Sequence, residues 1–260
     1  MRKIYIGLLC MVCLLISGCS SEFTNKETAV TEEDIVIDNS GLEILQLNHL
    51  VGNIKILLSD SDKVLIHTVK TTSAPTKSAL AEKSEKVTVE THVNANQLTI
   101  ETIDREQTKL FDLNVVADNS TIDYTIHIPD TIRVLSITNG VGDIQVAQLK
   151  ASCNITSGVG NINLGEIQLT GDSHIELGTG NITLDLSIDD LQTLLVTSGV
   201  GNIDISMPKE SQFRLNTDSG IGSTSGNLLH PPVDTEKDNH APVATIEITT
   251  GLGDISVNGK

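Results

Sequence analysis

Residues 137–146 read ITNGVGDIQV, and residues 155–164 read ITSGVGNINL. The same pattern recurs as IELGTGNITL from Ile175, VTSGVGNIDI from Val196, TDSGIGSTSG from Thr217 and ITTGLGDISV from Ile248. The first glycine of each segment stands at 140, 158, 178, 199, 220 and 251, so the spacings are 18, 20, 21, 21 and 31 residues. A period near 20 residues predicts stacked repeats, in which each unit covers the apolar face of its neighbour.

Each segment places two glycines around a single residue, and this spacing predicts a sharp corner. Glycine adopts positive φ without a steric penalty from Cβ. The residue between the glycines, such as Val159 or Val200, is predicted to turn inward and fill the corner. The predicted turn glycines are Gly140, Gly142, Gly158, Gly160, Gly178, Gly180, Gly199, Gly201, Gly220, Gly222, Gly251 and Gly253.

An Asn or Asp and then an Ile follow the second glycine in most segments. Asn and Asp side chains hydrogen-bond nearby backbone in turns, and stacked copies form polar ladders at strand spacing. We expect such a ladder from Asp143, Asn161, Asn181 and Asn202. The fifth segment has Ser223-Thr224 at this place, so its corner is expected to be less regular.

The rest of the chain also alternates apolar and polar residues, which predicts strands from Asp34 onward. Residues 78–86 are the one stretch that favours a short helix, and residues 86–103 predict a hairpin. The segment LNHLVGNIKI from Leu47 resembles a seventh copy, with Leu50 in place of the first glycine. The sequence therefore predicts an all-β fold: a β-solenoid, or β-helix-like stack, with layers about 4.8 Å apart, after an N-terminal β-rich region.

The first nineteen residues have the pattern of an export signal. A basic start is followed by an apolar run from Ile4 to Ile16, which is too short to span a membrane as a helix. Ile16-Ser17-Gly18-Cys19 resembles the lipobox of bacterial lipoproteins, which implies acylation of Cys19 and removal of residues 1–18. An ordinary signal with an incidental cysteine is the alternative. The predicted division is a signal at 1–18, a flexible tether at 19–33, a β-rich region at 34–128 and the repeats at 129–260.

Charge restricts the partners of this chain. It has 34 acidic and 17 basic residues, a formal net charge of −17. Such a chain is repelled by nucleic acid and by anionic lipid, so the predicted membrane contact is the lipid on Cys19 alone, on the extracytoplasmic side of the cell membrane. Cys153 is the one cysteine left after the lipidated residue, and its place in a strand predicts a buried apolar role.

Residues that carry chemistry are sparse. His230 and His240 flank acidic residues in the segment 228–241, which is predicted to be a solvated loop, with a divalent-metal site as the less favoured alternative. The Gly-x-Gly-Asn/Asp corners are similar to calcium-binding β-roll turns, but the period near 20 and the preference for Asn argue against calcium without excluding it. No nucleophile motif is present. We therefore expect no enzyme activity and no cofactor.

Tyr124-x-Ile-x-Ile-Pro129, followed by the Ser/Thr-x-Gly-x-Gly-Asn/Asp-Ile units, resembles the DUF4097 family of bacterial envelope proteins, which are described as adhesins with β-strand repeats. The resemblance covers roughly residues 42–257. It implies a repetitive all-β protein at the cell surface with relatives in envelope-stress systems, and it brings no catalytic or ligand-binding residues.

These observations favour a non-enzymatic surface module that contacts an envelope protein or a glycan. One alternative is a structural spacer or scaffold without a ligand. The other is a glycan-active β-helix enzyme, which is disfavoured because sugar clefts rely on aromatic faces and this chain has no Trp, two Tyr and three Phe.

Overall fold

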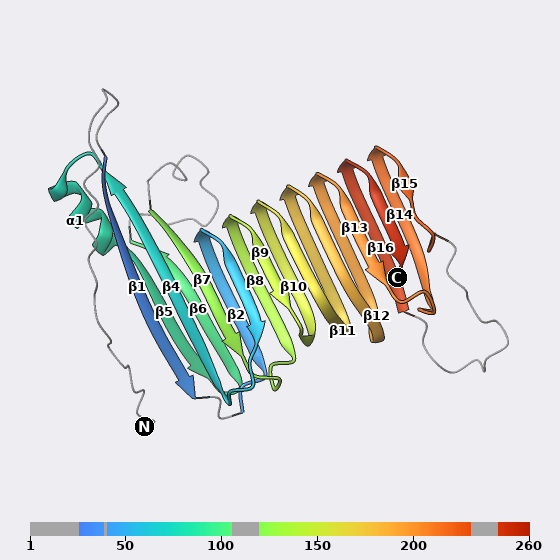
Figure 1. The fold of residues 1–260 in the computed structure, drawn as a ribbon, viewed down its shortest axis with the longest axis horizontal. Helices are drawn as coiled ribbons and strands as arrows, with labels where there is room; N and C mark the ends of the chain where they lie inside the picture. The colour runs from blue at the N-terminus through green and yellow to red at the C-terminus, as the bar shows by residue number, and fades with distance from the viewer. Residues whose placement is uncertain (1–25, 39–40, 106–119, 230–243) are drawn as a thin grey trace.

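The computed structural model describes residues 26–38, 41–105, 120–229 and 244–260, which form an all-β protein (Figure 1). Its strands lie in two ladders. In the approach ladder most strands run toward the glycine turns, and in the return ladder most strands run away from them. The long strands β11 (Ile162–Thr179) and β12 (Ile182–Val200) pass from the return ladder into the approach ladder, so both ladders belong to a single curled sheet.

The order of strands is the same along both ladders. The approach ladder consists of β5 (Val87–Asn94), β6 (Gln97–Asp104), β2 (Ile44–Val51), β8 (Val134–Val141), β10 (Lys150–Val159), the second parts of β11 and β12, β16 (Ala244–Leu252) and β14 (Phe213–Ile221). The return ladder consists of β1 (Glu27–Asp38), β4 (Lys63–Ala74), β7 (Ser120–Ile128), β3 (Ile54–Leu58), β9 (Ile144–Ala147), the first parts of β11 and β12, β13 (Ile203–Met207), β17 (Ile255–Gly259) and β15 (Thr224–Ser225).

The first strands and one helix close the N-terminal end of the sheet (Figure 1). Strands β1, β4 and β5 pair antiparallel with their neighbours, unlike the parallel strands that follow. Helix α1 (Lys77–Lys86) joins β4 to β5, and its first turn is capped by the Thr76 hydroxyl, which accepts a hydrogen bond from Ala79 N at 3.2 Å. In the described part of the chain, no helix has the length and apolarity needed to cross a membrane.

Successive repeats pair in parallel and in register. Ile137 lies opposite Ile155, Ile155 opposite Ile175, and Ile175 opposite Val196. The early copy of the pattern pairs in the same way, because Leu47 lies opposite Ile137. The inward side chains of both ladders alternate with outward polar ones and form a continuous apolar core. This core extends through the predicted regions 34–128 and 129–260 without a break between them.

The spatial order of the last two layers differs from their order in the sequence. The final repeat, from Ile248, pairs with β12, and the fifth repeat, from Thr217, pairs among the described residues with the final one alone. The 31-residue spacing between their first glycines supplies the chain that allows the final repeat to enter between the fourth and the fifth. The fifth repeat lies at the end, and its Ser223-Thr224 corner leads into a return strand of two residues.

The glycine turns are where layers approach most closely. The second glycine of every pair has φ between 135° and 158°, whereas the first glycines lie outside the left-handed region. The first glycine is required for another reason. A Cβ on Gly158 would meet the carbonyl oxygen of Gly140 at 2.5 Å, and a Cβ on Gly178 would meet that of Gly158 at 2.5 Å. Each turn therefore packs its backbone directly against the turn of the layer before it.

Most of the residues between the paired glycines face solvent, so the prediction that they fill the corner is wrong, although Val141 is half-buried. Val159 and Val200 are each 45% exposed, and Ile221 is 71% exposed. They stand at the tip of the turn, at the point farthest from the core. The corner is filled instead by the buried residue before the first glycine. In three layers the residue before the first glycine also hydrogen-bonds a turn: Asn139 Nδ2 donates to Gly142 O at 3.1 Å, Ser219 Oγ to Gly253 O at 2.9 Å, and Thr250 Oγ1 to Gly201 O at 3.0 Å.

The predicted polar ladder after the second glycine is confirmed. Asn161 N donates to Asp143 Oδ1 at 2.8 Å, Asn181 N to Asn161 Oδ1 at 3.1 Å, and Asn202 N to Asn181 Oδ1 at 2.9 Å. Asp254 continues the ladder in the final repeat, where hydrogen bonds from the backbone and hydroxyl of Ser223 hold the pKa of its carboxyl below the usual value.

The predicted tether, the predicted loop and Cys153 lie partly or wholly within the described residues. Strand β1 begins at Glu27, so residues 27–33 are part of the sheet and not of a flexible tether; they are held by twelve-residue antiparallel pairing with β4. Leu228, predicted in a solvated loop, is buried against the end of the core. Cys153 is fully buried as predicted, and burial raises the pKa of its thiol to about 12.

A buried polar network that no sequence pattern indicates lies between the two ladders. His49 Nδ1 lies 2.8 Å from Thr102 Oγ1, which in turn lies 2.7 Å from the hydroxyl of Tyr124. The His49 and Tyr124 rings also meet edge to face, with centroids 4.9 Å apart. Because burial disfavours the charged form, it lowers the pKa of His49 from 6.5 to about 4.

Stability should depend on pH through His49. Between pH 6.5 and pH 4 the unfolded chain binds a proton at this residue and the folded chain does not, so the free energy of unfolding falls as the pH is lowered, by up to about 3 kcal/mol. Thermal unfolding measured at pH 7 and at pH 4.5 tests this. His49→Gln should reduce the pH dependence, whereas His92→Gln, at an exposed position, should preserve it.

Substitution of a turn glycine should destabilise the protein strongly. In Gly201→Ala the new Cβ would collide with the carbonyl oxygen of Gly180 at a residue with φ 143°, and we expect a loss of at least about 2 kcal/mol. Gly165→Ala is the matched control, since a Cβ at Gly165 meets nothing within 4 Å. Equal unfolding midpoints in denaturant for the two variants would contradict the close packing of the turns.

Candidate binding groove

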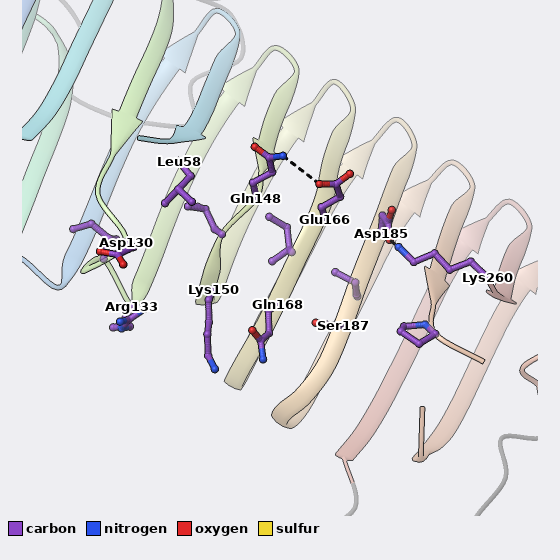
Figure 2. A pocket seen from close by; sticks show the side chains of 15 residues that line it. Leu58, Asp130, Arg133, Gln148, Lys150, Glu166, Gln168, Asp185, Ser187 and Lys260 are labelled. Atoms are coloured by element: carbon purple, nitrogen blue, oxygen red, sulfur yellow. Dashed lines mark hydrogen bonds and ion pairs between the residues drawn. The ribbon is translucent and has the colours of Figure 1, made fainter. Parts of the chain in front are cut away.

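A groove of about 700 Å³ lies at the edge of the sheet opposite the glycine turns (Figure 2). At this edge each return strand ends and the chain crosses to the next approach strand, and we call the depression the crossover groove. Its floor is apolar and its walls are polar. The floor residues are Leu58, Ile132, Leu149, Ile167, Leu186 and Pro208, and the wall residues are Asp130, Arg133, Gln148, Lys150, Glu166, Gln168, Asp185, Ser187 and Lys260.

The wall residues form two rows that follow the stacking of the layers. One row comes from the ends of return strands, with Gln148, Glu166 and Asp185 in successive layers. The other row comes from the beginnings of approach segments: Lys150 lies opposite Gln168, and Gln168 opposite Ser187. Polar groups therefore recur along the groove at the strand spacing of about 4.8 Å.

Two wall residues have left-handed backbone conformations. Gln148 has φ 60° and Glu166 has φ 55°, and they follow Ala147 and Gly165, which are paired in register. For a residue with a Cβ this conformation costs about 1–2 kcal/mol. Gln148 N donates to Gly165 O at 3.0 Å, which holds the two layers together at this bend. The strain thus coincides with the groove, as backbone strain often does with binding sites.

The charges in the groove are of both signs and partly paired. Gln148 Nε2 donates to Glu166 Oε2 at 3.2 Å, as Figure 2 shows, and Lys260 forms an ion pair with Asp185. Lys150 lies 2.6 Å from Asp190 outside the groove. Within the described ranges, the side chain of Arg133 has no hydrogen bond or ion pair. The groove therefore offers a free guanidinium beside amide and carboxylate groups, which suits hydrogen bonding to a polar ligand.

Catalytic chemistry has little support at this site. The residues that line the groove include no cysteine and no histidine to serve as a nucleophile or its base. Across the described residues there is no group of three or more His, Cys, Asp or Glu side chains placed to hold a metal ion. The arrangement can bind and orient a ligand.

A second cavity of about 200 Å³ lies at the N-terminal end, between β1, β4, β5 and β7. Lys70 lines it, but its ammonium group donates to the carbonyl oxygens of Ser84 at 2.8 Å and Val87 at 3.2 Å. Burial lowers the pKa of Lys70. Its contacts close the end of helix α1, so a structural role accounts for this residue.

The residues singled out by sequence lie away from the groove. All twelve predicted turn glycines are at the opposite edge, and Cys19, His230 and His240 lie outside the described residues. The groove was missed because its residues come from the connections, which share no motif. Gly165-Glu166 is the one local signal, since it adds a residue relative to the next layer and shifts the register between Leu164 and Ile167.

Comparison with known proteins supports the fold. No family model matches this chain, and no curated protein matches it. The crystal structure of a "putative cell adhesion protein" from Clostridium sporogenes is similar to 89% of this chain over 100% of its own length, with a TM-score of 0.56 and 17% identity. This likeness shows a shared fold. A "putative adhesin" from Bacteroides fragilis covers 88% of this chain and 97% of its own, at 14% identity, but its TM-score of 0.33 carries no argument.

Replacing a strained groove residue by glycine should stabilise the protein. Glu166→Gly removes the Cβ penalty at φ 55°, and we expect the free energy of unfolding to rise by about 0.5–1 kcal/mol. Asn163→Gly in the same strand is the control, because Asn163 is exposed and extended and glycine should weaken the strand there. Urea unfolding of both variants gives the measurement. Destabilisation by Glu166→Gly would show that the side chain at this position contributes more to the fold than its conformation costs.

Proposed function

We propose that this chain is a non-enzymatic, adhesin-like binding protein of the bacterial cell surface, and that its crossover groove binds an extended peptide segment of an envelope protein. The observation that carries the proposal is the groove itself, with an apolar floor beneath polar groups that recur at each layer. An extended peptide laid across the layers can place apolar side chains on the floor and hydrogen-bond the wall residues.

The groove favours a peptide over a glycan. Sugar-binding clefts stack pyranose rings on aromatic side chains. The described ranges contain one tyrosine and one phenylalanine, Tyr124 and Phe213, and both are buried. The wall offers Arg133, Glu166 and Gln168, which match the amides and mixed charges of a polypeptide.

The proposal also covers the fold type and the attachment of the protein to the membrane. The parallel, in-register layers support classification as a β-solenoid of the DUF4097 type, with two short strands in each layer. The fold shared with the Clostridium sporogenes protein is consistent with an adhesion role. Attachment through lipid on Cys19 is supported by the lipobox, which places the protein outside the cytoplasm on the cell membrane. The chain from Cys19 to the start of β1 at Glu27 then serves as the link between lipid and fold.

Site-specific photocrosslinking tests the groove. With a photoreactive phenylalanine analogue in place of Gln168, irradiation on intact cells should give a discrete protein adduct. The same analogue in place of Thr179, on the opposite edge, should give none. Adducts of equal intensity at both positions, or none at either, would contradict a peptide-binding groove. Adducts that a glycosidase removes and a protease does not would instead indicate a glycan ligand.

The spacer hypothesis makes a different prediction for the same cells. If the protein acts only as a scaffold, no position on its surface yields a discrete adduct, and charge reversal at Arg133 leaves surface binding unchanged. If the protein binds through the groove, Arg133→Glu should reduce the adduct formed at position 168, whereas Lys55→Glu, on the outer face of β3, should not.

A further inference from the structure

The C-terminal end of the approach ladder has a free strand edge. Strand β14 pairs with β16 on one side from Phe213 to Ile221. On its other side no strand is present among the described residues. A strand edge of this length presents a row of backbone N–H and C=O groups that can pair with another strand.

At the opposite end of the sheet the approach ladder ends in β5, and the return ladder ends in a strand that is protected against such pairing. Edge strand β1 contains five acidic residues and no basic one in ETAVTEEDIVID. Two such edges repel each other, which is a common protection of edge strands. Strand β14 carries one charge of each sign, Arg214 and Asp218, on its exposed face. Neither side chain has a hydrogen bond or ion pair among the described residues, so both are free to meet a partner.

We propose that the β14 edges of two copies of this chain pair antiparallel, with the twofold axis at Asn216. This register sets Arg214 opposite Asp218 of the second copy, and Asp218 opposite Arg214 of the second copy. Directly opposed residues in an antiparallel pair point to the same face, so each pair joins opposite charges. The sequence of β14 is thus complementary to itself.

The inner face of the strand fits the same register. Leu215 and Thr217 are half-buried at the open end of the core, and the register sets each opposite the other in the second copy. In this register odd-numbered residues lie opposite odd-numbered ones, and even-numbered residues lie opposite even-numbered ones. The backbone N–H and C=O groups that are free on one β14 edge therefore face those that are free on the other. The apolar cores of the two copies would then adjoin across β14.

The geometry fixes how the two copies face each other. In the return ladder Glu33 lies opposite Thr68, Thr68 opposite Tyr124, and Tyr124 opposite Ile54, the first strand residue after a turn. The start of β1 at Glu27 therefore projects beyond the glycine-turn edge by six residues, about 20 Å. Antiparallel pairing turns the two glycine-turn edges in opposite directions. Given the lipid anchor of the proposed function, the two copies belong to facing membranes, and the pairing is a homotypic contact between surfaces.

Complementary charge reversal tests the register. The chain from Ser20 onward, which contains every described residue, should be dimeric in sedimentation equilibrium. Arg214→Asp alone sets like charges opposite each other at both pairs, as does Asp218→Arg alone, and each should raise the dimer dissociation constant at least about tenfold. An equimolar mixture of the two variants restores both pairs and should regain the dimer. Glu176→Arg, on the exposed face of the central strand β11, is the control and should dimerise normally.

Two results would overturn the proposed β14 pairing. One is a wild-type protein that stays monomeric, and the other is a mixture of the two variants that associates no better than either variant alone. Thermal unfolding of each variant separates loss of association from loss of fold. Groove adducts at position 168 do not depend on β14, so they report on the proposed function independently. Vesicles carrying the lipidated Arg214→Asp chain should cluster with Asp218→Arg vesicles and not with each other; dimers in solution without vesicle clustering would overturn the facing-membrane arrangement.

Discussion

The structure depends on the absence of side chains at the paired glycines. A carbonyl oxygen of the preceding layer occupies the place where a Cβ would stand, at Gly158 against Gly140 and again at Gly178 against Gly158. Because only glycine permits this approach, the turns align from layer to layer and fix the register of every strand that enters or leaves them. The ladder of hydrogen bonds through Asn161 and Asn181 then satisfies the backbone N–H groups just after each turn.

Because the glycine turns fix one edge of the sheet, the layers differ from one another at the opposite edge. Differences in repeat length are absorbed where the chain crosses between ladders, as at the bends of Gln148 and Glu166 and in the connection before the final repeat. Both of these bends lie in the wall of the crossover groove. The glycine-turn edge is thus uniform from layer to layer, and the variable edge carries the groove that we propose as a binding site. Rigid scaffolds that carry variable connections commonly use them for binding.

Much of the local structure was predictable from sequence. Alternation gave the strands, the residues after the second glycine gave the polar ladder, and the position of Cys153 gave its burial. The orientation of Val159 and Val200 was predicted wrongly, because apolar character usually indicates the interior, whereas here the turn geometry places the residue between the glycines at the tip. Layers stack according to the complementarity of their surfaces and not according to their closeness in sequence. The position of the final repeat inside the stack was therefore not predictable either.

The groove and the His49 network could not be predicted from the sequence, for a related reason. The wall of the groove combines Arg133, Lys150 and Gln168 from separate layers, and none of them belongs to a motif. His49 stands just before the place of the first glycine, where the other repeats carry varied residues such as Ser157 and Leu177, and its partners Thr102 and Tyr124 come from strands distant in sequence. Periodicity describes each layer alone, whereas sites arise between layers.

The order of the layers determines which strand forms the free edge and how the crossover edge is built. Oxidative crosslinking of cysteine pairs measures it directly. Thr197 lies opposite Thr249 and two strands away from Asp218. We expect the Thr197→Cys, Thr249→Cys protein to form an intramolecular disulfide on oxidation and the Thr197→Cys, Asp218→Cys protein to form none. A disulfide in the second protein and none in the first would show that the repeats stack in sequence order, contrary to the order described here.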